Sequence, residues 1–94
     1  MEITGFIWLE KIVDKLTRKH HVTKEEIRDI FRSHAKYRLI EKGKVADENV
    51  YSALGQTNAG RYLIVFFIYK KTKEALIPSS RDMTKKERSR YEKK

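Results

Sequence analysis

Basic side chains gather in three stretches of the sequence, and one of these stretches also holds a histidine. The first contains Lys15, Lys19 and His20, and the second contributes Arg61. The third begins at Arg81 and continues with Lys85, Glu87, Arg88, Arg90 and Tyr91. Arginine binds phosphate oxygens through its planar fork, and histidine is the side chain that ordinarily titrates near neutral pH. These are the residue types needed to hold a phosphodiester and to move protons on it.

An RNA phosphodiester can be cleaved by its own 2′-hydroxyl, which attacks the adjacent phosphorus. A protein that promotes this reaction needs cations on the phosphate oxygens, a proton acceptor for the hydroxyl and a proton donor for the leaving oxygen. Arg61 and Arg81 suit the first task, and His20 suits proton transfer. The residue types alone do not separate cleavage from simple phosphate binding, so both interpretations stay open at this point.

The sequence offers no pattern typical of a metal or cofactor site. It contains no cysteine, and the adjacent His20 and His21 lack the spacing of paired metal ligands. His34 is interpreted as a partly buried structural residue of a helix. The glycines are isolated rather than grouped in a phosphate-binding loop, and the carboxylates alternate with basic residues instead of clustering. We therefore expect neither a metal nor a cofactor.

The overall charge points to a polyanionic partner. Lys and Arg number 22 against 13 Asp and Glu in 94 residues, which gives a formal net charge of +9. A field of that sign attracts nucleic acid first, and an acidic protein is another candidate. The longest apolar run, residues 62–69, is far shorter than a membrane-spanning helix requires, and no secretion signal is evident. We expect a soluble cytoplasmic protein that does not bind membranes.

Two helices are predicted before the first strand. Apolar residues recur with helical spacing between residues 9 and 16 and predict an amphipathic helix that ends around residues 19–21. Thr23 and Glu26 then form a capping box, which begins a second helix. These two helices place the first basic stretch at the end of one and just before the start of the other.

Four antiparallel strands and a third helix are predicted to follow. The strands cover residues 37–39, 50–54, 61–70 and 75–80. The third strand is apolar nearly throughout, which indicates a central strand buried on both faces, whereas Pro78 makes the fourth an edge strand or a bulged one. A polar loop is expected over residues 41–49. Thr84 and Glu87 form a second capping box, for a short helix that reaches about Tyr91. The prediction is a single α+β domain over residues 1–94.

An ordered set of short segments runs through most of the chain. Its first half is Phe6-x-Trp8, Lys15-Leu16, Lys19-His20 before Val22, Glu25-Glu26 and Phe31. Its second half is Gly60-Arg61, the segment from Ala75 to Arg81, Glu87-Arg88 and Tyr91. Together the segments resemble the BrnT toxin family. His21 stands where that family usually has glycine, and Pro78 and Ser80 alter its strand-end segment.

This resemblance implies a RelE/ParE-like fold and a metal-independent endoribonuclease toxin of a type II toxin–antitoxin system. It also implies a cognate DNA-binding antitoxin, either BrnA-like or a ribbon-helix-helix protein, through which alone the toxin would reach operator DNA. Carried over by position, the family pattern implies that Arg61 and Arg81 contact phosphate and that His20 transfers protons. Candidate catalytic residues are then His20, Arg61, Arg81 and Glu87. Candidate nucleic-acid-binding residues are Lys15, Lys19, Lys85, Arg88, Arg90 and Tyr91.

Each candidate also has a structural alternative. Arg61 and Arg81 stand at strand ends, where arginine often only pairs with a nearby acid such as Asp82. Glu87 is already explained by its capping box, and the ring of Tyr91 could close the core. For the whole protein, the alternatives are a non-catalytic RNA-binding module and a ParE-like toxin that acts on a protein target. The catalytic interpretation requires the basic side chains to converge on one concavity.

Overall fold

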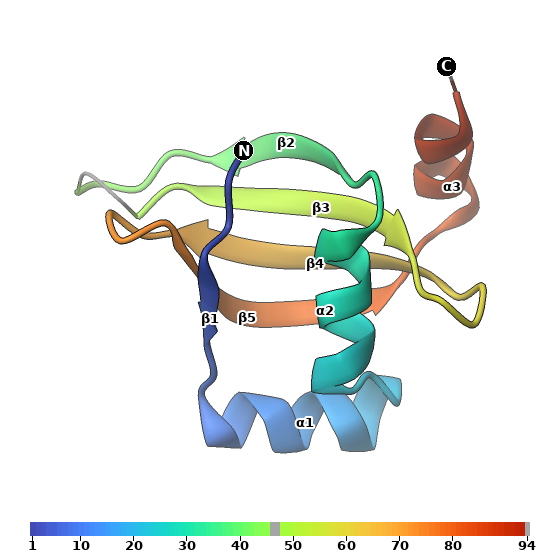
Figure 1. Ribbon diagram of the computed structural model, residues 1–94, viewed down its shortest axis with the longest axis horizontal. Helices are drawn as coiled ribbons and strands as arrows, with labels where there is room; N and C mark the ends of the chain where they lie inside the picture. The colour runs from blue at the N-terminus through green and yellow to red at the C-terminus, as the bar shows by residue number, and fades with distance from the viewer. Residues whose placement is uncertain (46–47, 94) are drawn as a thin grey trace.

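The computed structural model describes residues 1–45 and 48–93 and has an α+β architecture (Figure 1). The strands are β1 (Gly5–Ile7), β2 (Lys36–Glu41), β3 (Val50–Gln56), β4 (Tyr62–Tyr69) and β5 (Glu74–Asp82). The helices are α1 (Glu10–His20), α2 (Lys24–Arg32) and α3 (Lys85–Glu92). The predicted class and the three predicted helices are confirmed. The polar loop expected over residues 41–49 includes residues 46–47, which lie outside the described residues.

The described strands form one sheet in the order β1-β5-β4-β3-β2. The strand pairs among β2, β3, β4 and β5 are antiparallel, whereas β1 pairs in parallel with the start of β5. The prediction of four strands is therefore wrong by one. β1 has three residues, too few to show an alternating pattern, and it is fixed by a partner that lies far along the chain.

The central position of β4 is confirmed, and so is the distortion expected at Pro78. The register of β4 against β5 shifts between Phe66 and Ile68, so that Ile77 and Pro78 together lie opposite Phe67. This bulge is one of the settings in which a strand tolerates proline. Among the described residues, β1 pairs only with residues 74–76, so the rest of β5 has no strand partner on that side, where α1 packs against it.

Local sequence features determine where α1 ends and where α2 begins. Thr23 and Glu26 form the reciprocal capping box of α2. α1 is capped by His21, the residue after its end, whose φ of 53° lies in the left-handed region that favours glycine. This conformation explains why glycine suits that position. His34 lies beyond the end of α2 and is exposed, so its assignment to a partly buried helical position is wrong.

The main core lies between the sheet and the first two helices. Phe67 is fully buried there, and Ile27 and Ile30 bring α2 onto the same sheet face. The ring of Phe67 contacts the ring of Phe31 at a centroid distance of 5.1 Å and that of Tyr51 at 5.7 Å. Aromatic packing thus fixes α2 against β3 and β4.

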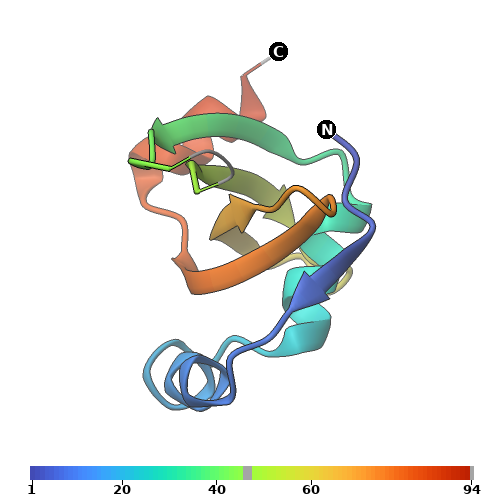
Figure 2. The same cartoon turned by 90° about the vertical axis from the view of Figure 1, so that its left-hand side faces the viewer.

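The opposite face of the sheet carries α3 (Figure 2). The ring of Tyr91 meets that of Tyr62 edge-to-face at 6.0 Å, and the Arg88 guanidinium lies 3.9 Å from the Tyr62 ring centre. Lys36 donates to the main-chain carbonyls of Arg90 and Lys93 at the end of the helix. The helix is short and strongly polar, so these few contacts hold it against the sheet.

Candidate functional site

Arg61 lies at the centre of a cluster of polar groups at one corner of the sheet. Its Nε donates to Asp82 Oδ1 at 2.8 Å, and its Nη2 donates to Asp82 Oδ2 at 3.3 Å. Its Nη1 donates to Glu26 Oε2 at 3.1 Å. The main-chain carbonyls of His20 and His21 accept from the same guanidinium at 2.7 and 2.6 Å. We call these five residues the corner cluster.

The corner cluster joins four parts of the chain that are distant in sequence. The guanidinium of Arg61 holds the end of α1, the start of α2 and the end of β5 together, and each of its three nitrogens donates. The hydrogen bonds to Asp82 raise the pKa of Arg61, and the same bonds lower the pKa of the Asp82 carboxyl. The ion pair between Arg61 and Asp82, which the sequence analysis gave as the alternative to phosphate binding, is therefore present. A role of Arg61 on phosphate stays a prediction, because a phosphate would have to compete with these partners.

The His20 side chain belongs to the same corner. Its charge contributes, after the larger effect of Arg61, to the lowered pKa of Asp82, so the ring lies within electrostatic reach of that carboxylate. The ring is partly buried, whereas Lys15 and Lys19 on the same helix are exposed. An imidazole near a carboxylate supplies the groups that proton transfer beside a phosphate requires.

Arg81 forms a second cluster, with Glu87. Its Nη1 and Nη2 donate to the two carboxylate oxygens of Glu87 at 2.8 and 3.0 Å, and its guanidinium lies 5.6 Å from the ring centre of Phe66. Glu87 also accepts the main-chain N–H of Thr84, which completes the predicted capping box. Arg81 thus ties the end of β5 to the first turn of α3.

The two arginines lie on opposite faces of the sheet. Asp82, the partner of Arg61, pairs in register with Leu63 of the main core, whereas Arg81 pairs with Ile64 on the other face. Arg61 contacts α1 and α2, and Arg81 contacts α3. The expectation that His20, Arg61 and Arg81 converge on one concavity is therefore wrong. Successive strand residues point to opposite sides, so the step from residue 82 to residue 81 separates the clusters.

The clusters nevertheless share one end of the molecule. The end of α1, the start of β4 and the end of β5 lie together, and α3 rises beside them (Figure 1). The end of β5 lies between the two clusters, because Asp82 belongs to one of them and Arg81 to the other.

Comparison with known proteins identifies the family. The chain matches the family described as "Ribonuclease toxin, BrnT, of type II toxin-antitoxin system" over residues 8–87. The chain belongs to the BrnT family. The match includes Lys15, Lys19 and His20 on α1, as well as Arg61, Arg81 and Glu87.

A solved structure supports the BrnT fold. The crystal structure of the Brucella abortus ribonuclease toxin BrnT is similar with a TM-score of 0.64 and 22% sequence identity, and the alignment covers 86% of this chain and 97% of that one. Because the sequence identity is only 22%, this similarity supports the fold and not the role of any residue. No curated protein matches the chain.

The remaining candidates of this BrnT-family chain lie on α3. Lys85 and Arg90 are exposed, Arg88 stacks on Tyr62, and the ring of Tyr91 is partly buried. The ring of Tyr91 packs on Tyr62 on the face opposite the main core, so it does not close that core as the alternative expected. Glu26 was missed as a site residue, because its capping box already explained it. One feature could have indicated that Glu26 also binds Arg61: a glutamate in a capping box uses one carboxylate oxygen for the cap and leaves the other available.

Two further properties concern the described residues as a set. Within residues 1–45 and 48–93, no three histidine, aspartate or glutamate side chains gather in a way that could hold a metal ion. None of the described helices has the length and apolar character that a membrane crossing demands.

We expect the Arg81–Glu87 pair to make the docking of α3 sensitive to acid. The hydrogen bonds from Arg81 lower the pKa of Glu87 from its ordinary value of 4.5 to about 2. Because the pKa is lower in the folded protein, the pair stabilises the fold fully above pH 4.5, and this stabilisation is lost as the pH falls toward 2. Glu87→Gln should therefore lower the free energy of unfolding by about 1 kcal/mol at pH 7.

Urea denaturation of the wild type and Glu87→Gln at several pH values measures this effect. The difference between the two proteins should shrink between pH 4.5 and 2. Gln can still serve in a capping box, so the variant isolates the ion pair from the cap. A difference that stays constant over that range would contradict the assignment.

Proposed function

We propose that this chain acts as a single toxin domain that cleaves RNA without a metal ion. The observation that carries the proposal is the family match over residues 8–87. The net charge of +9 and the basic residues at one end of the molecule support it, because RNA is a polyanion that such a surface attracts.

The corner cluster is the proposed place of the chemistry. His20 removes the proton of the 2′-hydroxyl, whose oxygen forms a bond to the adjacent phosphorus. The bond from phosphorus to the 5′-oxygen breaks, and that oxygen takes up a proton, leaving a 2′,3′-cyclic phosphate and a 5′-hydroxyl. Asp82 stabilises the protonated imidazole, and Lys19 offsets the charge on the phosphate. Arg61 acts in this scheme chiefly by holding the backbone that carries His20.

The α3 side supplies the proposed binding surface for the flanking RNA. Arg81 is only about one-third exposed and is oriented by Glu87. Further along α3, Lys85, Arg88 and Arg90 are exposed and can contact successive phosphates. RNA that passes around the end of the molecule where β5 ends would contact both faces, which would reconcile the separated clusters with a single substrate.

A cognate antitoxin is the second proposed partner. A type II family implies a protein that neutralises the toxin, and we propose a BrnA-like or ribbon-helix-helix protein that binds operator DNA and brings the toxin to it. An acidic segment would suit the basic end of the molecule. We further propose that the protein works in the cytoplasm and that its fold belongs to the RelE/ParE superfamily.

A cleavage assay in EDTA tests the proposed reaction. We expect the purified protein to cut RNA in EDTA and to leave 2′,3′-cyclic phosphate ends, and we expect induction to stop growth until the antitoxin is expressed. Intact RNA with growth arrest would indicate a ParE-like toxin that acts on a protein. RNA binding without either effect would indicate a non-catalytic module.

A further inference from the structure

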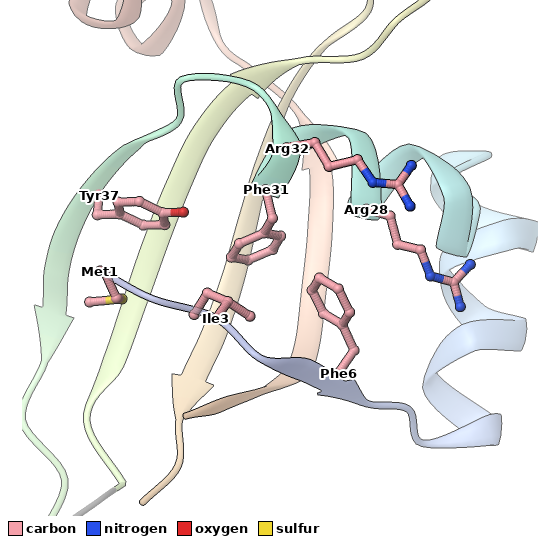
Figure 3. A pocket seen from close by; sticks show the side chains of 7 residues that line it. All are labelled: Met1, Ile3, Phe6, Arg28, Phe31, Arg32 and Tyr37. Atoms are coloured by element: carbon pink, nitrogen blue, oxygen red, sulfur yellow. The ribbon is translucent and has the colours of Figure 1, made fainter. Parts of the chain in front are cut away.

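A pocket of about 240 Å³ lies beside α2, and none of its lining residues belongs to the corner cluster or to the Arg81–Glu87 pair (Figure 3). The N-terminal segment, α2 and the start of β2 surround it. Its lining residues are Met1, Ile3, Phe6, Arg28, Phe31, Arg32 and Tyr37. The pocket is thus built from three separate elements, and two kinds of side chain dominate it, aromatic rings and arginines.

The aromatic rings form the wall of the pocket. Phe6 and Phe31 meet edge-to-face at a centroid distance of 5.2 Å, and Phe31 lies 6.2 Å from the tilted ring of Tyr37. All three rings are partly exposed, and Phe31 rests on the buried Phe67 behind it. These rings are rigidly supported and still accessible, as a surface for stacking must be.

Two arginines stand at the rim, one helical turn apart on α2. The side chain of Arg32 is 67% exposed, and its contact with Asp29 is a loose one of 3.9 Å. Arg28 lies 5.5 Å from the ring centre of Trp8 and pairs with the exposed Glu25. In each pair one partner is mostly exposed, Arg32 in the first and Glu25 in the second, so both pairs are weak and we expect an incoming phosphate to compete with the carboxylates.

The hydroxyl of Tyr37 points into the pocket (Figure 3). It makes no hydrogen bond to any residue that the structure describes, although the ring is well packed. Burial raises the pKa of Tyr37, which keeps the phenol neutral and able to donate. The pocket therefore offers a hydrogen-bond donor that has no protein acceptor.

We propose that this pocket binds one nucleobase of single-stranded RNA. The inference rests on the proposed function and gives it a specificity site. The base stacks on the Phe6 and Phe31 rings, Tyr37 donates to its polar edge, and the rim arginines bind the attached phosphate. An apolar side chain of a protein partner would use only the rings and would leave the hydroxyl and both guanidiniums without partners.

The position of the pocket relative to the corner cluster suits this role. Glu26 in the first turn of α2 belongs to the corner cluster, and Arg32 at its end lines the pocket. At 1.5 Å per residue the two lie about 9 Å apart along the helix axis. One RNA strand can therefore occupy both sites, and the pocket fixes which base lies at a set distance from the cleaved bond.

The test uses a short RNA in which 2′-O-methyl groups prevent cleavage. Trp8 is the only tryptophan of the chain and stacks on Phe6 at 5.3 Å, so its fluorescence reports binding at the pocket. An abasic nucleotide is placed at each position in turn. We expect loss of one particular base to weaken binding about tenfold, because stacking on an aromatic ring contributes about 1–3 kcal/mol.

Protein variants give an independent readout. Arg28→Gln with Arg32→Gln should weaken binding about tenfold, and Tyr37→Phe should change which base is preferred at the sensitive position. Lys11→Gln with Lys71→Gln is the matched control, because both lysines are exposed, neither lines the pocket, and neither belongs to the proposed RNA-binding residues. Thermal melting of each variant identifies any that fail to fold, and the abasic series needs no variant.

The outcomes separate this proposal from the proposed function. An abasic series without a sensitive position overturns the pocket proposal, even if the protein cleaves RNA. Rim variants that keep RNA affinity but lose the antitoxin overturn it too, and indicate a protein docking site. A single sensitive position in a protein that never cleaves RNA supports the pocket and rejects the nuclease.

Discussion

His20→Asn is expected to lower the rate of RNA cleavage by about 10²–10⁴-fold, which is the usual contribution of a general acid or base. The fold should survive, because Arg61 binds the main-chain carbonyl at this position rather than the imidazole. RNA affinity should stay within about twofold, since the lysines and arginines around the site are unchanged. Single-turnover cleavage and equilibrium binding, measured on the same preparation, separate the two quantities.

His21→Asn is the matched control for this substitution. His21 is an exposed neighbouring histidine, and asparagine tolerates the left-handed conformation found there. This variant should cleave at the wild-type rate within about twofold. If His20→Asn retained more than a tenth of the activity, the proton acceptor would have to be sought elsewhere.

Arg61→Ala is expected to affect both stability and activity. Its removal leaves Glu26 and Asp82 close together without their cation, and it releases the end of α1. The free energy of unfolding should fall by about 2 kcal/mol, as expected for hydrogen bonds between charged groups in a partly exposed site. Cleavage should fall about 10²-fold at a temperature where the variant is folded, because the displaced helix end carries His20.

A second variant decides between a positioning role and phosphate binding by Arg61. Glu26→Gln preserves the capping box and removes one of the carboxylates that Arg61 binds. If Arg61 positions His20, this change should lower both stability and cleavage. If Arg61 binds phosphate, freeing it should leave cleavage unchanged or raise it. Arg61→Lys should restore part of the stability, since lysine keeps the charge but lacks the planar fork.

The local features of this fold can be predicted from the sequence because their causes are local. The capping boxes at Thr23 and Thr84 involve residues three positions apart, and both are present. The central place of β4 follows from its continuous apolar character, and the bulge follows from the missing N–H of Pro78. Physical rules that act within a few residues suffice for these features.

The features that the sequence does not reveal depend on pairing between distant segments. β1 exists only because residues 74–76 lie beside it. The separation of Arg61 from Arg81 follows from the register of β4 against β5, which composition does not fix. Phe6, Phe31 and Tyr37 each have an ordinary packing explanation, and only the assembled fold shows that they share a cavity with Arg28.

The way the corner cluster is assembled has a consequence for the cell that makes the toxin. Arg61 joins residues 20, 21, 26 and 82, so the acidic partner that completes the corner is synthesised long after the histidine. A nascent chain on the ribosome therefore carries His20 without the groups that position it. In the proposed function, the RNA around the ribosome would therefore meet a complete corner cluster only after β5 has been synthesised and has paired with β4.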